Sequence, residues 1–218
     1  MFLKLFSMFK NTVGADKRLL LPIAGTGLYL FFYWIATIKY PGGSQADRTS
    51  KGFSWAHNYW CNLLNESGIN GLPNPGRSYA LTGMLLLCIS LTWFWYRFAA
   101  FAPLKKSHRF SMQASAVSSM TIAFFIYTDR HDYIINIACL FALGALTGTF
   151  LGLYKMKWWA LFTLGIFNLI LVAVNNYLYY GGGLLYLPVV QKITFGFFLL
   201  WICLICIKQY RITETGFD

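Results

Sequence analysis

The chain has 218 residues, of which 57% are hydrophobic and 11% are charged, and its formal net charge is +11. A soluble domain usually has about a quarter of its residues charged, so this composition excludes an ordinary soluble globule. The basic residues lie in short blocks beside apolar segments, a pattern typical of membrane topology rather than of nucleic-acid binding. We therefore predict an integral membrane protein with no nucleic-acid partner.

Six segments are each apolar over about the 20 residues that a helix needs to cross the hydrocarbon core of a bilayer. The predicted spans are 19–38, 79–99, 111–128, 134–154, 158–180 and 186–208. The predicted fold is all-α: one membrane domain over residues 1–218, formed by a bundle of six transmembrane helices.

The connection 40–78 is long and rich in aromatic residues. Its apolar side chains recur near helical spacing from Phe53 through Tyr59 and Trp60 to Leu64. This periodicity predicts a short helix that lies in the membrane interface, with its Trp and Tyr rings at headgroup depth.

The distribution of basic residues predicts the orientation. With the N-terminus inside, the inner segments contain twelve basic residues: Lys4, Lys10, Lys17, Arg18, Arg97, Lys105, Lys106, Arg109, Lys155, Lys157, Lys208 and Arg211. The outer segments contain five: Lys39, Arg48, Lys51, Arg77 and Arg130. The positive-inside rule then places both termini in the cytoplasm and the connection 40–78 outside, and we expect the membrane to be a bacterial inner membrane.

Small residues predict where two of the spans pack. Gly144, Gly148 and Gly152 repeat every fourth residue in the fourth span, and Ser115 and Ser119 belong to a small-residue face of the third span. Small residues allow helix backbones to approach closely in lipid. We therefore expect these two helices to pack together at the centre of the bundle.

Ionisable side chains gather at the predicted outer ends of the spans, where they are candidates for function. Asp129, His131 and Asp132 lie between the third and fourth spans, and His57 lies in the interfacial segment. Two imidazoles and two carboxylates can form an acid/base pair or a metal site, with His57 and His131 as ligands. The alternative is a solvated connection with a helix cap, because the spacing matches no diagnostic metal motif.

Other polar and aromatic residues are candidates for binding a lipid or another ligand. Asn168 and Asn175 face the same way in the fifth span, where they can line a pathway or join helices by hydrogen bonds. Lys192 lies about one turn into the last span, within reach of the outer headgroups. The complete set of candidates is Asn58, Trp60, Arg77, Arg130, Asn168, Asn175 and Lys192.

Two groups of residues carry a resemblance to known families. They are Asn62-Leu63 and Asn74-Pro75 followed by Ala80, and Thr128-Asp129 and His131 leading into Ala138 and Phe141. In these features the chain resembles an uncharacterised bacterial six-helix membrane family allied to the DRAM-like proteins, and it is distantly similar to the ceramidase and adiponectin-receptor superfamily. The superfamily's hydrolases hold one zinc ion with three histidines, whereas here only His57 and His131 share a side.

These observations lead to three functional hypotheses. The first is a membrane protein of unassigned activity whose outer polar face binds a lipid headgroup or a membrane partner, with no cofactor expected. The second is an intramembrane metal-dependent lipid hydrolase that uses zinc. The third is a small transporter or channel. Membrane lipids are the expected partners, together with a second copy of the chain or another membrane protein.

Overall fold

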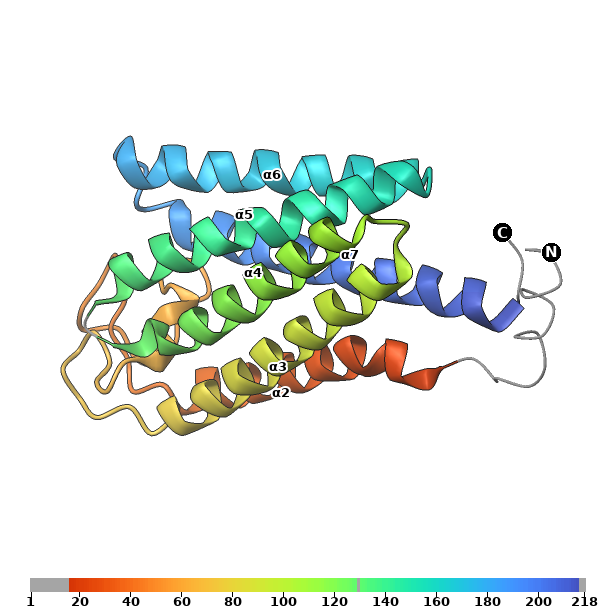
Figure 1. The fold of residues 1–218 in the computed structure, drawn as a ribbon. Coiled ribbons are helices and arrows are strands. Elements are labelled where there is room, and N and C mark those ends of the chain that lie inside the picture. The colour runs from red at the N-terminus through yellow and green to blue at the C-terminus, as the bar shows by residue number, and fades with distance from the viewer. Residues whose placement is uncertain (1–15, 129, 216–218) are drawn as a thin grey trace, which may run out of the picture.

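The computed structural model describes residues 16–128 and 130–215, most of which lie in six long helices arranged side by side (Figure 1). The long helices are α2 (Leu21–Lys39), α3 (Arg77–Phe101), α4 (Lys106–Phe124), α5 (His131–Lys155), α6 (Trp159–Tyr180) and α7 (Leu187–Thr215). Three short 3-10 helices accompany them: η1 (Lys17–Leu20), η2 (Trp60–Leu64) and η3 (Phe125–Tyr127). The predicted all-α, six-helix fold is confirmed.

All six helices, with η1 continuing into α2 and η3 extending α4, are long and apolar enough to cross a membrane. The chain is therefore an integral membrane protein. Several helices extend beyond the predicted spans, most of all α4, which begins at Lys106 instead of 111, and α7, which continues to Thr215 instead of ending at 208. Hydropathy detects only the apolar part of a helix, whereas the backbone hydrogen bonds of the helix continue into polar sequence. The apolar span is therefore shorter than the helix.

The two ends of the bundle differ in what they carry (Figure 1). One end, which we call the loop end, carries the connection 40–76 and the turn 181–186. The opposite end, which we call the terminal end, carries Lys17 and Thr215 together with the connections 102–105 and 156–158. Because the chain has an even number of spans, its two described ends lie at the same end of the bundle.

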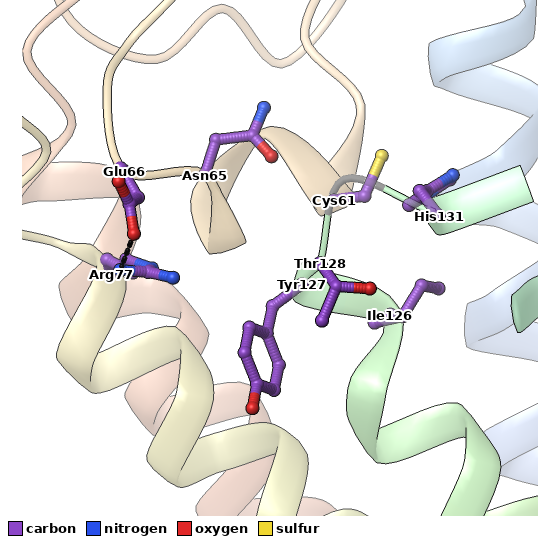
Figure 2. Close-up of a pocket in the computed structure, with 8 residues that line it drawn as sticks. All are labelled: Cys61, Asn65, Glu66, Arg77, Ile126, Tyr127, Thr128 and His131. Atoms are coloured by element: carbon purple, nitrogen blue, oxygen red, sulfur yellow. Dashed lines mark hydrogen bonds and ion pairs between the residues drawn. The ribbon is translucent and has the colours of Figure 1, made fainter.

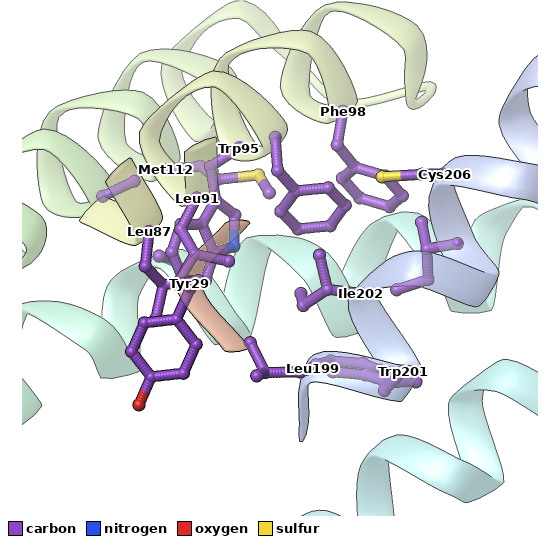
Figure 3. Close-up of a cluster of buried hydrophobic side chains, with 14 of the residues drawn as sticks. Tyr29, Leu87, Leu91, Trp95, Phe98, Met112, Leu199, Trp201, Ile202 and Cys206 are labelled. Atoms are coloured by element: carbon purple, nitrogen blue, oxygen red, sulfur yellow. The ribbon is translucent and has the colours of Figure 1, made fainter. Parts of the chain in front are cut away.

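Large aromatic and aliphatic side chains form the core of the bundle (Figure 3). Trp95 Nε1 donates to Thr149 Oγ1 at 3.1 Å, which joins α3 to α5, and Trp201 Nε1 donates to Leu161 O at 2.7 Å, which joins α7 to α6. A buried indole N–H needs such an acceptor. The cluster includes Tyr29, Leu87, Leu91, Trp95, Phe98, Met112, Leu199, Trp201, Ile202 and Cys206.

The predicted close packing between the third and fourth spans is confirmed. A Cβ added to Gly148 would lie within 2.9 Å of three side-chain atoms of Met112, and Gly144 faces Ser115 in the same way. Ser119 of α4 also donates to Ala138 O of α5 at 2.9 Å. The expectation that this pair occupies the centre is wrong, because α2, α3 and α7 are more buried than α4 and α5. Glycines permit close approach, but the bulky aromatic side chains determine where the core lies.

The helix in the connection 40–76 is shorter than the periodicity predicts, since only Trp60 to Leu64 is helical. Asparagine side chains bind the backbone here instead. Asn58 Oδ1 accepts from Ser54 N at 2.8 Å, and Asn62 Oδ1 accepts from Tyr59 N at 2.7 Å. Such local bonds compete with helical ones, which explains why the apolar periodicity does not produce a longer helix.

Candidate functional site

The loop-end site depends on a buried asparagine that holds the connection 40–76 in shape. Asn58 is fully buried, and its Nδ2 donates to Gly43 O at 2.8 Å. The backbone carbonyl oxygen of Asn58 accepts a hydrogen bond from the Lys192 ammonium of α7. Asn58, predicted to bind a ligand, thus acts within the protein as a bridge between the two sides of the loop and the last helix.

Lys192 is engaged by the protein rather than free to reach headgroups. Its Nζ also donates to Pro188 O at 2.9 Å and lies 5.6 Å from the centroid of the Phe53 ring. The Trp60 ring beside it packs on Tyr33 of α2 and Phe195 of α7, with ring centroids 5.1 and 5.8 Å apart. These contacts fasten the loop to α2 and α7.

The residues that carry the family resemblance build the next part of the loop. Asn74 Nδ2 donates to Leu63 O at 3.1 Å and to Asn65 O at 3.0 Å, and its Oδ1 accepts from Gly76 N. With the Asn62 bond described above, these contacts set the path of the backbone between the two motifs. That path places Cys61, Asn65 and Glu66 around a cavity.

This cavity, which we call the Arg77 cavity, has a volume of about 670 Å³. It lies between η2, the start of α3, the end of η3 and the start of α5. Figure 2 shows Arg77 and Glu66 on one side, Cys61 and His131 opposite, and Asn65 between them. Its lining consists of Cys61, Asn65, Glu66, Arg77, Ile126, Tyr127, Thr128 and His131.

Arg77 supplies the cavity's positive charge. Its Nε donates to Leu64 O at 3.0 Å and its Nη1 donates to Glu66 Oε1 at 2.8 Å. A guanidinium group has five N–H donors, so three remain after these two bonds. The centroid of the Tyr127 ring lies 5.9 Å from the guanidinium carbon, within range of a cation–π interaction.

His131 is the first residue of α5 and stands opposite Arg77 in the cavity. Its Nδ1 lies 3.1 Å from Asp132 Oδ1, and its Nε2 is buried without a hydrogen-bond partner among the described residues. Cys61 lies beside it, but burial raises the pKa of that thiol to about 11. The thiol is therefore protonated near neutral pH, which argues against a nucleophilic cysteine at this site.

A second cavity of about 470 Å³ lies between α5, α6 and α7 at the same end, and we call it the amide groove. It shares Cys61 and His131 with the Arg77 cavity, so the two are neighbours. Besides these two residues, the polar part of its described lining comprises four amides, three phenols and one carboxylate. These are Asn136, Asn175, Asn176, Gln191, Tyr59, Tyr179, Tyr180 and Asp132.

Of the four predicted catalytic residues, the structure brings His131 and Asp132 together. His57 lines neither cavity, and its Nδ1 lies 3.3 Å from Ser54 Oγ within its own turn. Asp129 lies outside the described residues. Within residues 16–128 and 130–215, no group of three or more His, Cys, Asp and Glu side chains is placed to hold a metal ion. The described residues therefore offer His131 and Asp132 as a pair, without a third ligand.

Of the remaining residues that were predicted to bind a ligand, two line a cavity and two do not. Arg77 lines a cavity, whereas Arg130 is exposed and lines neither of the two. Asn175 borders the amide groove and also donates to Thr194 of α7, so it joins two helices. Asn168 is buried in α6 and donates to Leu164 O of its own helix at 2.9 Å.

Several lining residues were not predicted from the sequence. Asn65 and Glu66 were missed because polar residues in a loop are ordinarily solvated. Asn136 had a signal, since it is an amide in the second turn of an otherwise apolar span, as Gln191 is in the last. Comparison with known proteins returned no matching family model, curated relative or solved structure.

Proposed function

We infer that this integral membrane protein binds the phosphate group of a lipid headgroup in the Arg77 cavity. The observation that carries this proposal is the guanidinium group at the cavity wall, with three N–H donors not used by Leu64 or Glu66. Arginine binds phosphate oxygens through paired N–H groups, which gives both strength and orientation. Asn65 adds an amide beside it.

The shape and surroundings of the cavity suit a lipid rather than a free anion. Ile126 and the Tyr127 ring form an apolar floor on the membrane side, below the polar groups. An acyl chain can leave the cavity along that floor while the phosphate stays with Arg77. Glu66 offsets part of the positive charge, which weakens the binding of a small free anion that has no apolar contact to compensate.

The orientation proposed for the protein puts the loop end outside a bacterial inner membrane, because most basic residues flank the terminal end. Reporter fusions after Pro103 and after Phe217 should therefore read as cytoplasmic, and a fusion after Gln45 should read as external. An external signal after Phe217 would contradict the proposed orientation and would place the Arg77 cavity on the other leaflet.

Replacement of Arg77 by glutamine is expected to lower the affinity for dihexanoyl phosphatidylethanol by at least tenfold, since a charged hydrogen bond contributes about 1.5–3 kcal/mol. This lipid carries one phosphodiester and no other polar headgroup substituent. Binding would be measured by calorimetry on the protein in a neutral detergent. Inorganic phosphate should bind the parent more weakly than the lipid; equal affinities would identify a site for free phosphate instead.

The matched control is Arg130→Gln, which removes an exposed arginine at the same end of the bundle. Its affinity should stay within about twofold of the parent, because its contribution is screened by solvent. A second control, Glu66→Gln, keeps the bond from Arg77 to Leu64 while freeing the guanidinium, and should bind at least as tightly as the parent. Equal affinities for Arg77→Gln and Arg130→Gln would refute the proposal.

A further inference from the structure

The amide groove has a chemistry different from that of the Arg77 cavity. Among the described residues that line it there is no lysine or arginine, and the carboxylate of Asp132 already faces His131. A second phosphate or another anion is therefore poorly matched to it. Amides and phenols both donate and accept hydrogen bonds, so they suit an uncharged group that does the same.

Two of the four amides are not used to hold the helices together. Asn136 is exposed and forms no side-chain hydrogen bond with the described residues, and Asn176 donates only to Val172 O of its own helix at 3.0 Å. Asn175 and Gln191, by contrast, do join parts of the protein: Asn175 donates to Thr194 of α7, and Gln191 accepts from the backbone N–H of Trp60. Polar side chains in a membrane span are costly unless they are bonded, and neither of these two bonds to another helix, which makes both candidates for a ligand.

The amides reach the groove at one depth from three helices. Asn136 lies five residues into α5, Gln191 four residues into α7, and Asn176 four residues before the end of α6. At 1.5 Å per residue, each is about 6–8 Å below the end of its helix. This depth matches the boundary between headgroups and hydrocarbon, since the interfacial layer is about 5–7 Å thick on each side.

Aromatic rings complete the groove. The Tyr179 and Tyr180 rings lie edge to face with centroids 5.0 Å apart, and the Tyr59 hydroxyl donates to Leu184 O at 3.3 Å. The last bond connects the 40–76 loop with the turn 181–186 above the groove. Ring faces beside hydrogen-bonding amides offer both an apolar and a polar surface to a compact ligand that carries hydroxyl groups on a carbon frame.

We propose that the amide groove binds the hydroxyl-bearing part of a phospholipid headgroup, a glycerol or sugar moiety, whose phosphate occupies the neighbouring Arg77 cavity. The two cavities meet at Cys61 and His131, so one headgroup can occupy both. This inference rests on the proposed function and names the class of lipid. Asn136 and Asn176 hydrogen-bond the hydroxyl groups, and Arg77 binds the phosphate.

The test compares dihexanoyl phosphatidylglycerol with dihexanoyl phosphatidylethanol. Both carry one negative charge on a phosphodiester, and only the first has free hydroxyl groups. The parent should bind phosphatidylglycerol about tenfold more tightly, as two additional hydrogen bonds allow. The double variant Asn136→Ala/Asn176→Ala should lose this preference and keep its affinity for phosphatidylethanol within about twofold. Equal affinities of the parent for the two lipids would overturn the inference.

The matched control is Gln113→Ala, which removes an amide from α4 that lines neither cavity. It should preserve the preference for phosphatidylglycerol. A double variant that retains the preference, or a Gln113→Ala variant that loses it, would also overturn the inference. The proposed function fails separately, if Arg77→Gln leaves the affinity for phosphatidylethanol unchanged.

Discussion

Replacement of Gly148 by leucine is expected to lower the free energy of unfolding by about 3 kcal/mol, at the upper end of the usual cost of overpacking a core. The cause is the contact between α5 and α4, because even a Cβ at this position would overlap the Met112 side chain. A leucine would have to separate the two helices along the seam that Ser119 closes by its bond to Ala138 O. Unfolding in mixed detergent micelles, followed by circular dichroism, measures the change.

Gly27→Leu is the matched control for this prediction. Gly27 lies within α2, and no atom stands within 4 Å of an added Cβ. Leucine also favours a helix by about 1 kcal/mol over glycine, so this variant should be as stable as the parent or slightly more stable. Similar losses for Gly27→Leu and Gly148→Leu would mean that the glycines act through helix flexibility and that the α4–α5 contact is looser than described.

Replacement of Lys192 by methionine is expected to release the 40–76 loop and to weaken the lipid binding that we propose for the loop end. Methionine has a similar length and cannot donate to Asn58 O, which would stay buried without that partner. The loss should be about 2 kcal/mol, typical for a hydrogen bond from a charged group. Hydrogen exchange of the backbone from 53 to 60 should accelerate about thirtyfold if this segment opens independently.

Lys51→Met serves as the control, because Lys51 is an exposed residue of the same loop. It changes the net charge equally and should alter neither hydrogen exchange nor affinity. If Lys192→Met exchanges as slowly as the parent, the hydrogen bond from Lys192 to Asn58 O does not hold the loop in place, and the other contacts of the loop are sufficient.

The sequence predicts the bundle better than the loop-end site, for physical reasons. Membrane spans are recognised from hydropathy and length, which are local properties. The loop depends on bonds between distant residues, such as Asn58 with Gly43 and with Lys192, and no periodic pattern indicates these pairs. Arg77 was recognised because a charge beside a membrane span is conspicuous. Asn65 was not, because its role depends on the backbone path set by Asn74.

Lys192 and Gln191 also bear on how the protein is made. The backbone N–H of Trp60 donates to Gln191 and the Lys192 ammonium donates to Asn58 O, so the loop binds a helix more than 120 residues later in the chain. A ribosome adds about 5–20 residues per second, which leaves the loop without these partners for about 6–30 s. During that interval its aromatic side chains are available to chaperones and proteases. Insertion of the last helix completes the site, so a chain truncated before α7 should be a substrate for degradation.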